Sequence, residues 1–279
     1  MMATNETLKN QIQKKKNGNK NTPQGYTIKQ LMSADSVKKR FEETLGKKAP
    51  QFMASVINLV NSDTNLQKCD QMSVISSAMI AASLDLPIDK NLGYAWVVPY
   101  GNKATFQLGY KGYVQLALRT GQYKNINVIE VYEGELKSFN RLTEEIELDF
   151  EGKASDKVIG YVGYFELING FQKTVYWSKE EIERHKKRFS QSGFAWKDNY
   201  NDMAKKTVLR NMLNKWGILS IDMQKAYIED VKDPNEQELS DEENEIIEAE
   251  FTEYLGEEEE QRKDTSEPTE EEMSAVLGE

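Results

Sequence analysis

The sequence is poor in thiol and imidazole side chains, with one cysteine and one histidine. Cys69 has no second cysteine with which to form an internal disulfide, and His185 cannot complete a zinc site built from cysteines and histidines. A lone histidine also argues against a hydrolase in which histidine activates a serine or a cysteine. These absences exclude disulfide scaffolds, structural zinc modules and histidine-dependent hydrolases.

Long apolar runs and a phosphate-binding loop are missing as well. No segment reaches the roughly 18 apolar residues of a membrane helix, and the Lys-rich N-terminus has no apolar stretch of signal-peptide length. We therefore expect a soluble, cytoplasmic protein without a membrane partner. Because no G-x-x-x-x-G-K-[ST] loop occurs, we expect no ATP-driven motor.

Acidic residues offer the remaining route to catalysis. Glu133 with Glu135, and Glu147 with Asp149 and Glu151, carry oxygen ligands of the kind that hold Mg²⁺ in nucleases. Their strand-like spacing and the high acidic content of the chain favour exposed surface positions instead. We therefore predict that the protein is not an enzyme.

Charge is distributed unevenly along the chain, whose formal net charge is −10. Residues 233–279 hold 20 acidic and 2 basic residues, a net of −18, which leaves 26 acidic and 34 basic residues elsewhere, a net of +8. A basic folded part fits a polyanion binder, because neutralising phosphates supplies most sequence-independent affinity for nucleic acid. A solubilising tail on an ordinary domain accounts for the charge equally well.

Composition predicts three parts. Residues 1–32 form a flexible basic arm, which contacts phosphates or a neighbouring subunit or is a plain disordered terminus. Residues 33–232 form the folded core, and residues 233–279 form an acidic, disordered tail. Apolar residues at helical spacing in the tail are Ile246, Ile247, Phe251, Tyr254 and Leu255. The tail therefore either folds onto a protein partner or only aids solubility.

Hydrophobic periodicity within the core alternates between helix and strand. Helices are expected over about 33–45, 50–61, 70–84, 111–120, 178–189 and 199–216. Strands are expected over about 94–99, 104–108, 125–132, 145–150, 158–168 and 171–177. Asn169 and Gly170 are a strong hairpin signal between the last two strands. The predicted fold class is α+β, with an antiparallel sheet and hairpins flanked by helices.

Basic residues gather on two of the predicted helices. In the helix after Gly109, Lys111, Gln115 and Arg119 share one face, which is either a ligand-binding or a solvated face. The opposite face, which should pack, carries Tyr113, Leu116 and Ala117.

The 199–216 helix carries Lys205, Lys206 and Arg210. Lys205 lies in line with the apolar residues Leu209 and Trp216, where a surface helix normally buries an apolar side chain. A lysine at that position needs an anionic partner or an open groove, unless its stem passes along the core to reach water.

A third basic cluster lies between these helices, and aromatic residues are interleaved with all three. The cluster comprises Arg184, Lys186, Lys187 and Arg188, and the aromatic residues are Tyr110, Tyr113, Tyr123, Phe189, Phe194, Trp196 and Tyr200. Proteins that bind single strands combine a cationic groove with rings for base stacking, at about 1–3 kcal/mol per stacked base. Since most Tyr and Trp residues in a chain of this size belong to the core, we expect at most a few to touch bases.

Five sequence blocks, in order, resemble the RecT family of phage and prophage recombinases. They are CDQMSVISSAMIAASLDL at 69–86, GYAWVVP at 93–99, LGYKGYVQLALRTG at 108–121, VIEVYE at 128–133 and WKDNYNDMAKKTVLRNMLNKW at 196–216. The resemblance spans about residues 35–220 and implies annealing of complementary single-stranded DNA without ATP. It further implies assembly into rings or helical filaments in a bacterial host cell, distant kinship with Redβ, and partnership with a phage 5′ to 3′ exonuclease.

The resemblance also selects site residues. The G-Y-K-G block gives Lys111, and the M-x-K-K-T-x-L-R block gives Lys205, Lys206 and Arg210, the positions that the helical faces also select. With Arg119 they are predicted to line a groove that holds the DNA backbone. Further candidate DNA-binding residues are Tyr110, Tyr113, Gln115, Lys187 and Trp196.

Expected partners are single-stranded DNA, the annealed duplex, further copies of the chain, a phage exonuclease and the host single-strand-binding protein. No cofactor is expected, and Mg²⁺ would act only as a counterion of DNA. The alternative is a general module for single-stranded RNA or DNA that has no annealing activity.

Overall fold

The computed structural model describes residues 27–189 and 194–232. The predicted acidic tail and most of the predicted basic arm lie outside these described residues. The predicted arm extends too far, because helix α2 (Ile28–Ser33) begins within it and Thr27 forms a capping box with Gln30. The buried residues of α2 are Ile28, Leu31 and Met32. Apolar burial at helical spacing therefore moves the start of the folded core ahead of residue 33.

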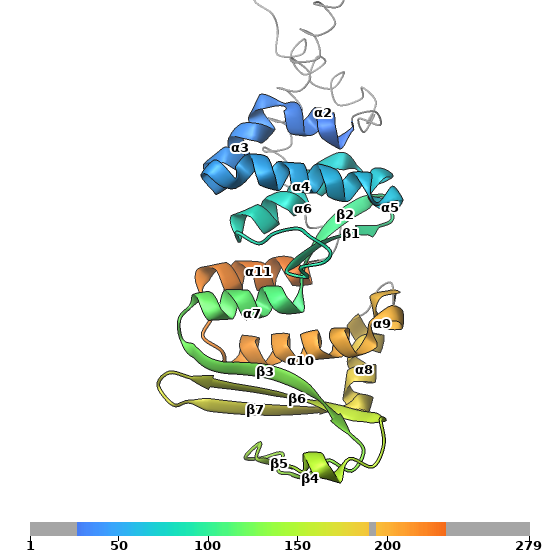
Figure 1. Ribbon diagram of the computed structural model, residues 1–279, viewed down its shortest axis with the longest axis vertical. Helices are drawn as coiled ribbons and strands as arrows, with labels where there is room; N and C mark the ends of the chain where they lie inside the picture. Colours follow the sequence, from blue (N-terminus) through green and yellow to red (C-terminus); the bar gives the residue numbers. More distant parts are fainter. Residues whose placement is uncertain (1–26, 190–193, 233–279) are drawn as a thin grey trace, which may run out of the picture.

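Helices form one end of the molecule (Figure 1). They are α2, α3 (Asp35–Leu45), the 3-10 turn η1 (Gly46–Lys48), α4 (Ala49–Asn61), α5 (Thr64–Gln67) and α6 (Gln71–Ser83). Side-chain caps fix two of these starts: Asp63 accepts from backbone N–H groups of α5, and Asp70 does so for α6. Small buried residues, among them Ser77 and Ala78, allow α6 to pack closely against the strand over residues 103–108.

A hairpin of β1 (Ala95–Tyr100) and β2 (Lys103–Leu108) pairs Ala95 with Leu108 and joins the helical layer to the rest. The Ser73 hydroxyl accepts from the Ala104 N–H at 2.8 Å, and the Ser77 hydroxyl donates to the Ala104 carbonyl at 3.1 Å. These buried bonds satisfy polar groups where α6 crosses β2.

The remaining elements build a sheet covered by helices. They are α7 (Tyr110–Arg119), β3 (Tyr123–Tyr132), β4 (Leu136–Phe139), β5 (Ile146–Leu148), the 3-10 turn η2 (Phe150–Gly152), β6 (Val158–Leu167), β7 (Gln172–Ser178), α8 (Lys179–Phe189), α9 (Phe194–Asp198), α10 (Tyr200–Trp216) and α11 (Ile221–Val231). The sheet is antiparallel with the order β3-β6-β7, and β4 pairs with β5 in a separate hairpin.

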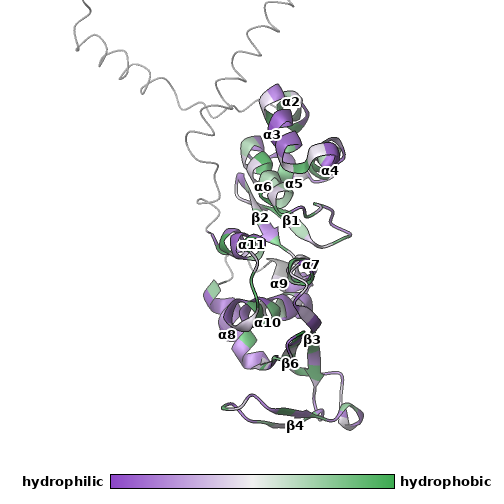
Figure 2. Cartoon of the chain, turned by 90° about the vertical axis from the view of Figure 1, so that its left-hand side faces the viewer, coloured by the Kyte–Doolittle hydropathy of each residue, from purple (hydrophilic) through white to green (hydrophobic). Residues whose placement is uncertain are grey.

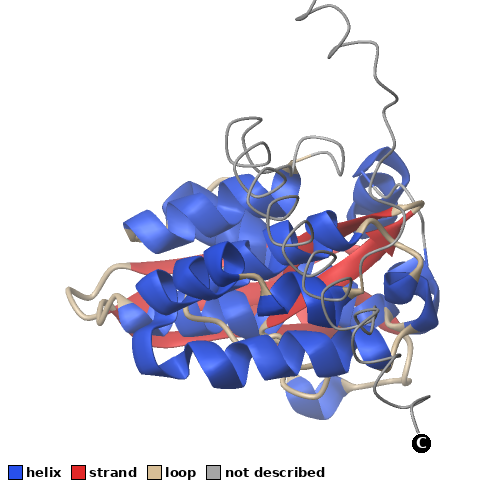
Figure 3. Cartoon of the chain, turned by 90° about the horizontal axis from the view of Figure 1, so that it is seen from above, coloured by secondary structure: helices blue, strands red, loops and turns tan. Residues whose placement is uncertain are grey.

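The layers stack along the long axis of the molecule. Figure 1 shows the helices α2 to α6, the β1–β2 hairpin, the α7 and α11 pair, α10, and the β3-β6-β7 sheet in succession. Figure 2 shows the β4–β5 hairpin projecting at the end opposite α2. In the view from above, helices overlie the strands (Figure 3). Helix α10 therefore lies between the sheet and the α7 and α11 pair.

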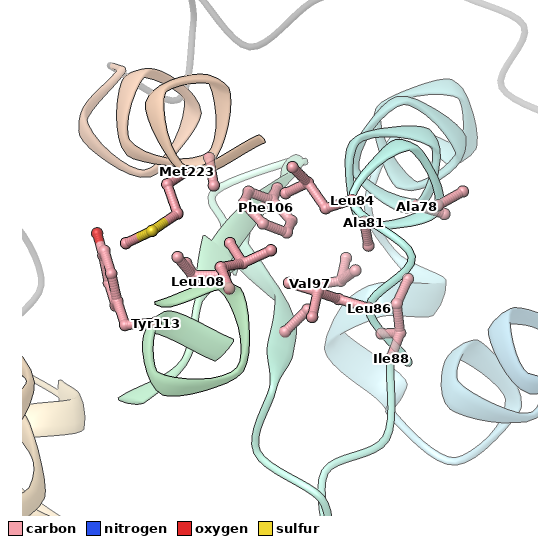
Figure 4. Close-up of a cluster of buried hydrophobic side chains, with 14 of the residues drawn as sticks. Ala78, Ala81, Leu84, Leu86, Ile88, Val97, Phe106, Leu108, Tyr113 and Met223 are labelled. Atoms are coloured by element: carbon pink, nitrogen blue, oxygen red, sulfur yellow. The ribbon is translucent and has the colours of Figure 1, made fainter. Parts of the chain in front are cut away.

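A continuous apolar core links these layers. Figure 4 shows part of it, where Phe106 and Leu108 of β2 meet Leu84, Tyr113 of α7 and Met223 of α11. Phe106 and Leu108 are fully buried. The hairpin thus packs against α6 on one side and against α7 and α11 on the other.

The predicted α+β class is confirmed, and each predicted helix and strand has a counterpart. The predictions did not include the short elements α2, α5, β4 and α9, the two 3-10 turns, or the longer α11. Ser220 caps α11 by accepting from the Met223 N–H at 3.2 Å. Because only Met223 and Ala226 are buried on α11, its hydrophobic periodicity is weak.

Candidate nucleic-acid interface

Close backbone packing positions the start of α7. The Gly109 N–H donates to the Tyr94 carbonyl at 2.8 Å. A Cβ atom on Gly109 would lie 2.1 Å from the Gly93 carbonyl oxygen, and one on Gly112 would lie 2.2 Å from the Tyr94 carbonyl oxygen. The two glycines of the G-Y-K-G block are therefore required so that α7 can lie against residues 93 and 94.

This packing leaves Lys111 exposed beside an aromatic ring. A Cβ atom on Gly93 would lie 3.9 Å from Cδ of Lys111 and 3.8 Å from Cζ2 of Trp96. Trp96 is 36% exposed, although it lies on a strand whose neighbouring residues Ala95 and Val97 are buried. A lysine side chain in the neighbourhood of an accessible indole offers one group for a phosphate and one for a base of the same strand. The sequence analysis did not select Trp96. The signal that could have found it is the two-residue period of a strand, which places Trp96 on the face opposite to Ala95 and Val97.

Lys205 turns from α10 toward the sheet. Its ammonium group lies 3.1 Å from a carboxylate oxygen of Glu130 on β3 and 3.3 Å from one of Asp202. Burial is the largest single influence and lowers the pKa of Lys205, but the hydrogen bonds and charges of Glu130 and Asp202 together outweigh it, so the pKa is raised. Of the alternatives that the sequence left open for Lys205, the structure shows the anionic partner, supplied by Glu130 and Asp202. Tyr110, adjacent to Lys111, is half-buried near Lys205, and burial raises the pKa of its phenol.

Lys206 and Arg210 turn the other way, toward α11. The side chain of Asp230 is 1% exposed and accepts from Lys206 Nζ at 3.1 Å and from Arg210 Nη1 at 3.5 Å. It also accepts from the Leu108 N–H and from the Tyr113 hydroxyl, both at 2.9 Å. Burial, followed by the charge of Asp230, raises the pKa of Tyr113 well above its usual value. These two cations therefore share one buried carboxylate that the sequence analysis missed.

Arg119 contacts the end of α6. Its guanidinium donates to the carbonyl of Leu84 at 2.6 Å and to that of Asp85 at 2.7 Å. The Asp85 backbone is left-handed, with φ of 47°, and its carboxylate accepts from Lys48 at 2.8 Å. Arg119 thus satisfies carbonyls at a helix C-terminus, where cations are favourable.

The other candidate residues are scattered. Gln115 is half-buried on α7, and Lys187 is exposed on α8 beside a hollow of about 410 Å³. Tyr113 is 3% exposed and Trp196 is 6% exposed, so neither ring presents a face to a base in this conformation. The structure therefore places Lys111 near Trp96 and Tyr110 near Lys205, and places Arg119, Lys187 and Trp196 elsewhere.

Three of the acidic residues weighed as metal ligands, Glu133, Glu135 and Asp149, have clear structural partners. Glu135, expected on the surface, is 5% exposed and accepts from the Tyr132 N–H at 2.8 Å. Glu133 accepts from Ser155 at 2.9 Å, and Asp149 pairs with Lys137 at 3.1 Å. Among the described residues, no group of three or more His, Cys, Asp or Glu side chains is placed to hold a metal ion. The expectation of an exposed position is wrong for Glu135 because its carboxylate is used to satisfy a backbone N–H.

A larger hollow, of about 580 Å³, lies between β7, α8 and the C-terminal end of α10. Arg184, Lys215 and Trp216 line part of it, and Lys173 Nζ lies 3.6 Å from the centre of the Trp216 ring. None of the predicted groove residues lines this hollow. No helix among the residues that the structure describes is long and apolar enough to span a bilayer.

Comparison with known proteins assigns the chain to a family. The RecT family model matches residues 50–250. The uncharacterized protein YqaK of Bacillus subtilis (strain 168) is 66% identical over 232 residues, which cover 82% of this chain and 81% of YqaK. Protein RecT of Escherichia coli (strain K12) is 28% identical over 210 residues, which cover 69% of this chain and 77% of that protein. The chain therefore belongs to the RecT family, whose members are DNA-annealing proteins of recombination and generally not catalytic enzymes.

Proposed function

We propose that this protein binds single-stranded DNA through its backbone and anneals complementary strands without ATP, in phage-type homologous recombination. The observation that carries the proposal is the placement of Lys111, exposed at the start of α7, beside the accessible ring of Trp96. Both residues lie within the range 50–250 that the RecT family model matches, and the close packing of Gly109 and Gly112 on residues 93 and 94 places α7 next to the segment that carries Trp96.

The proposed mechanism separates holding a strand from reading it. Annealing requires the Watson–Crick edges of the bound strand to stay free, so protein contacts should go to phosphates and to base faces. Lys111 would supply a phosphate contact and Trp96 a stacking surface, with Lys205 extending the cationic line along α10. Glu130 and Asp202, which partly neutralise Lys205, would limit its affinity for any one phosphate. Pairing between the two DNA strands would then supply both specificity and driving force, without a nucleotide cofactor.

Assembly into a ring or helical filament completes the proposal. The surface from Trp96 to Lys205 would contact only a few nucleotides, and linking many such sites raises overall affinity far above that of one site. Adjacent subunits would continue the groove and keep two long strands in register. A phage 5′ to 3′ exonuclease that exposes single strands, and the host single-strand-binding protein, are the proposed partners in the bacterial cytoplasm.

A binding titration with a matched pair of variants tests the DNA contact. Lys111→Gln removes an exposed charge at the proposed interface, whereas Lys39→Gln removes an exposed charge on α3, at the helical end. For a labelled oligonucleotide, we expect Lys111→Gln to flatten the slope of log affinity against log salt by about 0.7, the value for one phosphate contact. Lys39→Gln should leave the slope unchanged. Equal slopes for both variants would refute the assignment of Lys111.

Acceleration of pairing distinguishes the proposal from its main rival. A general module for single-stranded nucleic acid would bind RNA as well as DNA and would not accelerate pairing. Because contacts to phosphates and base faces are common to RNA and DNA, an RNA competitor of equal length should displace bound DNA in either case, whereas only the proposed protein should speed the pairing of complementary DNA strands. Binding of both nucleic acids without faster pairing would support the general module.

A further inference from the structure

Four donors converge on the buried carboxylate of Asp230. Leu108 and Tyr113, which come from the block around G-Y-K-G, donate through a backbone N–H and a phenol at 2.9 Å each. Lys206 and Arg210, which come from the M-x-K-K-T-x-L-R block, donate through an ammonium and a guanidinium at 3.1 and 3.5 Å. Two blocks separated by more than 80 residues thus build one site, and Asp230 lies outside both.

The donor set has the chemistry of a phosphate site. A phosphodiester and a carboxylate each carry one negative charge and present two unsubstituted oxygens. A guanidinium, an ammonium, a hydroxyl and a backbone N–H are the groups that proteins use to hold phosphate oxygens. The Asp230 carboxylate therefore stands where a phosphodiester would find the same four partners.

Helix α11, which carries Asp230, is lightly attached to the body of the protein. Its buried apolar residues are Met223 and Ala226, and the side chain of Asp230 is also buried. Three apolar residues face solvent, with exposed fractions of 84%, 53% and 49% for Ile221, Ile228 and Val231. Because apolar burial contributes most of the free energy that docks a helix, the small apolar contact of α11 leaves a larger share of its docking to the contacts of Asp230.

We infer that the four donors form a binding site for a phosphodiester of the DNA backbone, which Asp230 occupies until α11 moves away. The identity of this ligand rests on the proposed function, whereas the anion site itself rests on the geometry alone. In this arrangement Lys206 and Arg210 are neutralised in the free protein and become available to DNA only by exchange of one anion for another. Strand binding is thereby coupled to release of the C-terminal helix.

Substitution of Asp230 tests the exchange. Asp230→Asn removes the competing charge and keeps the shape of the side chain, while Asp222→Asn removes an exposed charge from the same helix as a matched control. With a labelled single-stranded oligonucleotide, we expect affinity to rise on the order of tenfold for Asp230→Asn, because one charged competitor is lost. The control should change affinity much less. Equal affinity for the two folded variants, or weaker binding by Asp230→Asn, would overturn the exchange.

Hydrogen exchange on the unmodified protein gives a test that does not depend on a variant that folds. Exchange at the amides of residues 221–231 should become faster when the oligonucleotide binds, because the helix is released. Slower or unchanged exchange there, in a sample whose DNA is bound, would contradict the inference.

Inorganic phosphate separates failure of this site from failure of the proposed function. The melting temperature of Asp230→Asn should rise with added phosphate more than that of Asp222→Asn, because only in the former has the anion site lost its competing negative charge. A selective rise in a protein that binds no DNA would support the anion site and refute the proposed function. Equal rises, in a protein that binds DNA, would refute the site and leave the proposed function intact.

Discussion

The substitution Gly112→Ala examines how the G-Y-K-G block positions its lysine. Glycine is unfavourable inside a helix, and replacing it with alanine at an unobstructed position stabilises a protein by about 1 kcal/mol. At Gly112 the added Cβ would lie 2.2 Å from the Tyr94 carbonyl oxygen and 2.7 Å from Cδ1 of Leu108. Ordinary contact begins near 3.4 Å, so α7 must move by more than 1 Å from a backbone oxygen that cannot rotate aside.

The two effects have opposite signs, and the obstruction is the larger one. Overpacking a well-filled site costs about 1–3 kcal/mol, and a clash with backbone belongs at the upper end of that range. After the gain of about 1 kcal/mol from helix propensity, the free energy of unfolding should fall by about 2 kcal/mol. Denaturant titration followed by circular dichroism measures the change. An unchanged or increased free energy of unfolding would show that α7 does not pack on residues 93 and 94 as described.

A second glycine separates lost stability from lost function. Gly170 lies in the β6–β7 turn with φ of +86°, and a Cβ there would meet nothing within 4 Å. Gly170→Ala should therefore cost only about 1–2 kcal/mol of backbone strain, without moving α7. At a temperature where both variants are folded, Gly112→Ala should bind single-stranded DNA more weakly, while Gly170→Ala should match the unmodified protein. Equal DNA affinity of the two variants would show that the packing of α7 does not determine how Lys111 contributes to DNA binding.

Three further substitutions have distinct expected signatures. Trp96→Leu should weaken binding of single-stranded DNA by about 5- to 150-fold, the equivalent of ~1–3 kcal/mol for one stacked base, with no change in salt slope. An unaltered dissociation constant would show that Trp96 does not contact the DNA. Arg119→Gln should lower the free energy of unfolding by about 1–3 kcal/mol through loss of its bonds to Leu84 and Asp85. The folded variant should show an unchanged slope of log DNA affinity against log salt, and a slope flatter by about 0.7 would instead indicate a phosphate contact. Burial, with a further contribution from Arg210, lowers the pKa of His185 in the folded protein, so the unfolded chain binds its proton more readily and stability should decline as pH falls below about 6.5. Thermal melts at several pH values should show this decline for the unmodified protein and a smaller decline for His185→Phe. If the melting temperatures of the two proteins fall equally with pH, His185 does not contribute to the decline.

Local patterns along the sequence were sufficient to predict most of the fold. Alternating segments predicted the β1–β2 hairpin, and Asn169 with Gly170 predicted the β6–β7 turn, because these signals involve residues close together in the chain. The same holds for the packed face of α7, where Leu116 and Ala117 are buried as expected. Helix α11 was missed because a helix with few buried apolar residues has little periodicity to detect.

Partners across the fold could not be predicted in the same way. The helical position of Lys205 indicated that an anion was needed, but only the register of β3 beneath α10 identifies Glu130. The bond from Leu108 to Asp230 spans 122 residues, and no local pattern links them. The five predicted groove cations therefore proved to have three kinds of surroundings: solvent at Lys111, carboxylates at Lys205, Lys206 and Arg210, and helix-end carbonyls at Arg119.

Sequential mixing of two complementary labelled oligonucleotides with the purified full-length protein, in the absence of ATP, tests the proposed function most directly. The protein is first bound to one strand, the second strand is added, and pairing is followed by fluorescence over a range of salt concentrations while strand length is checked on a gel. We predict pairing much faster than without protein, a salt-sensitive complex that retains the product, and strands of unchanged length. Binding without faster pairing would contradict the annealing function, and shortened strands would show a nuclease instead.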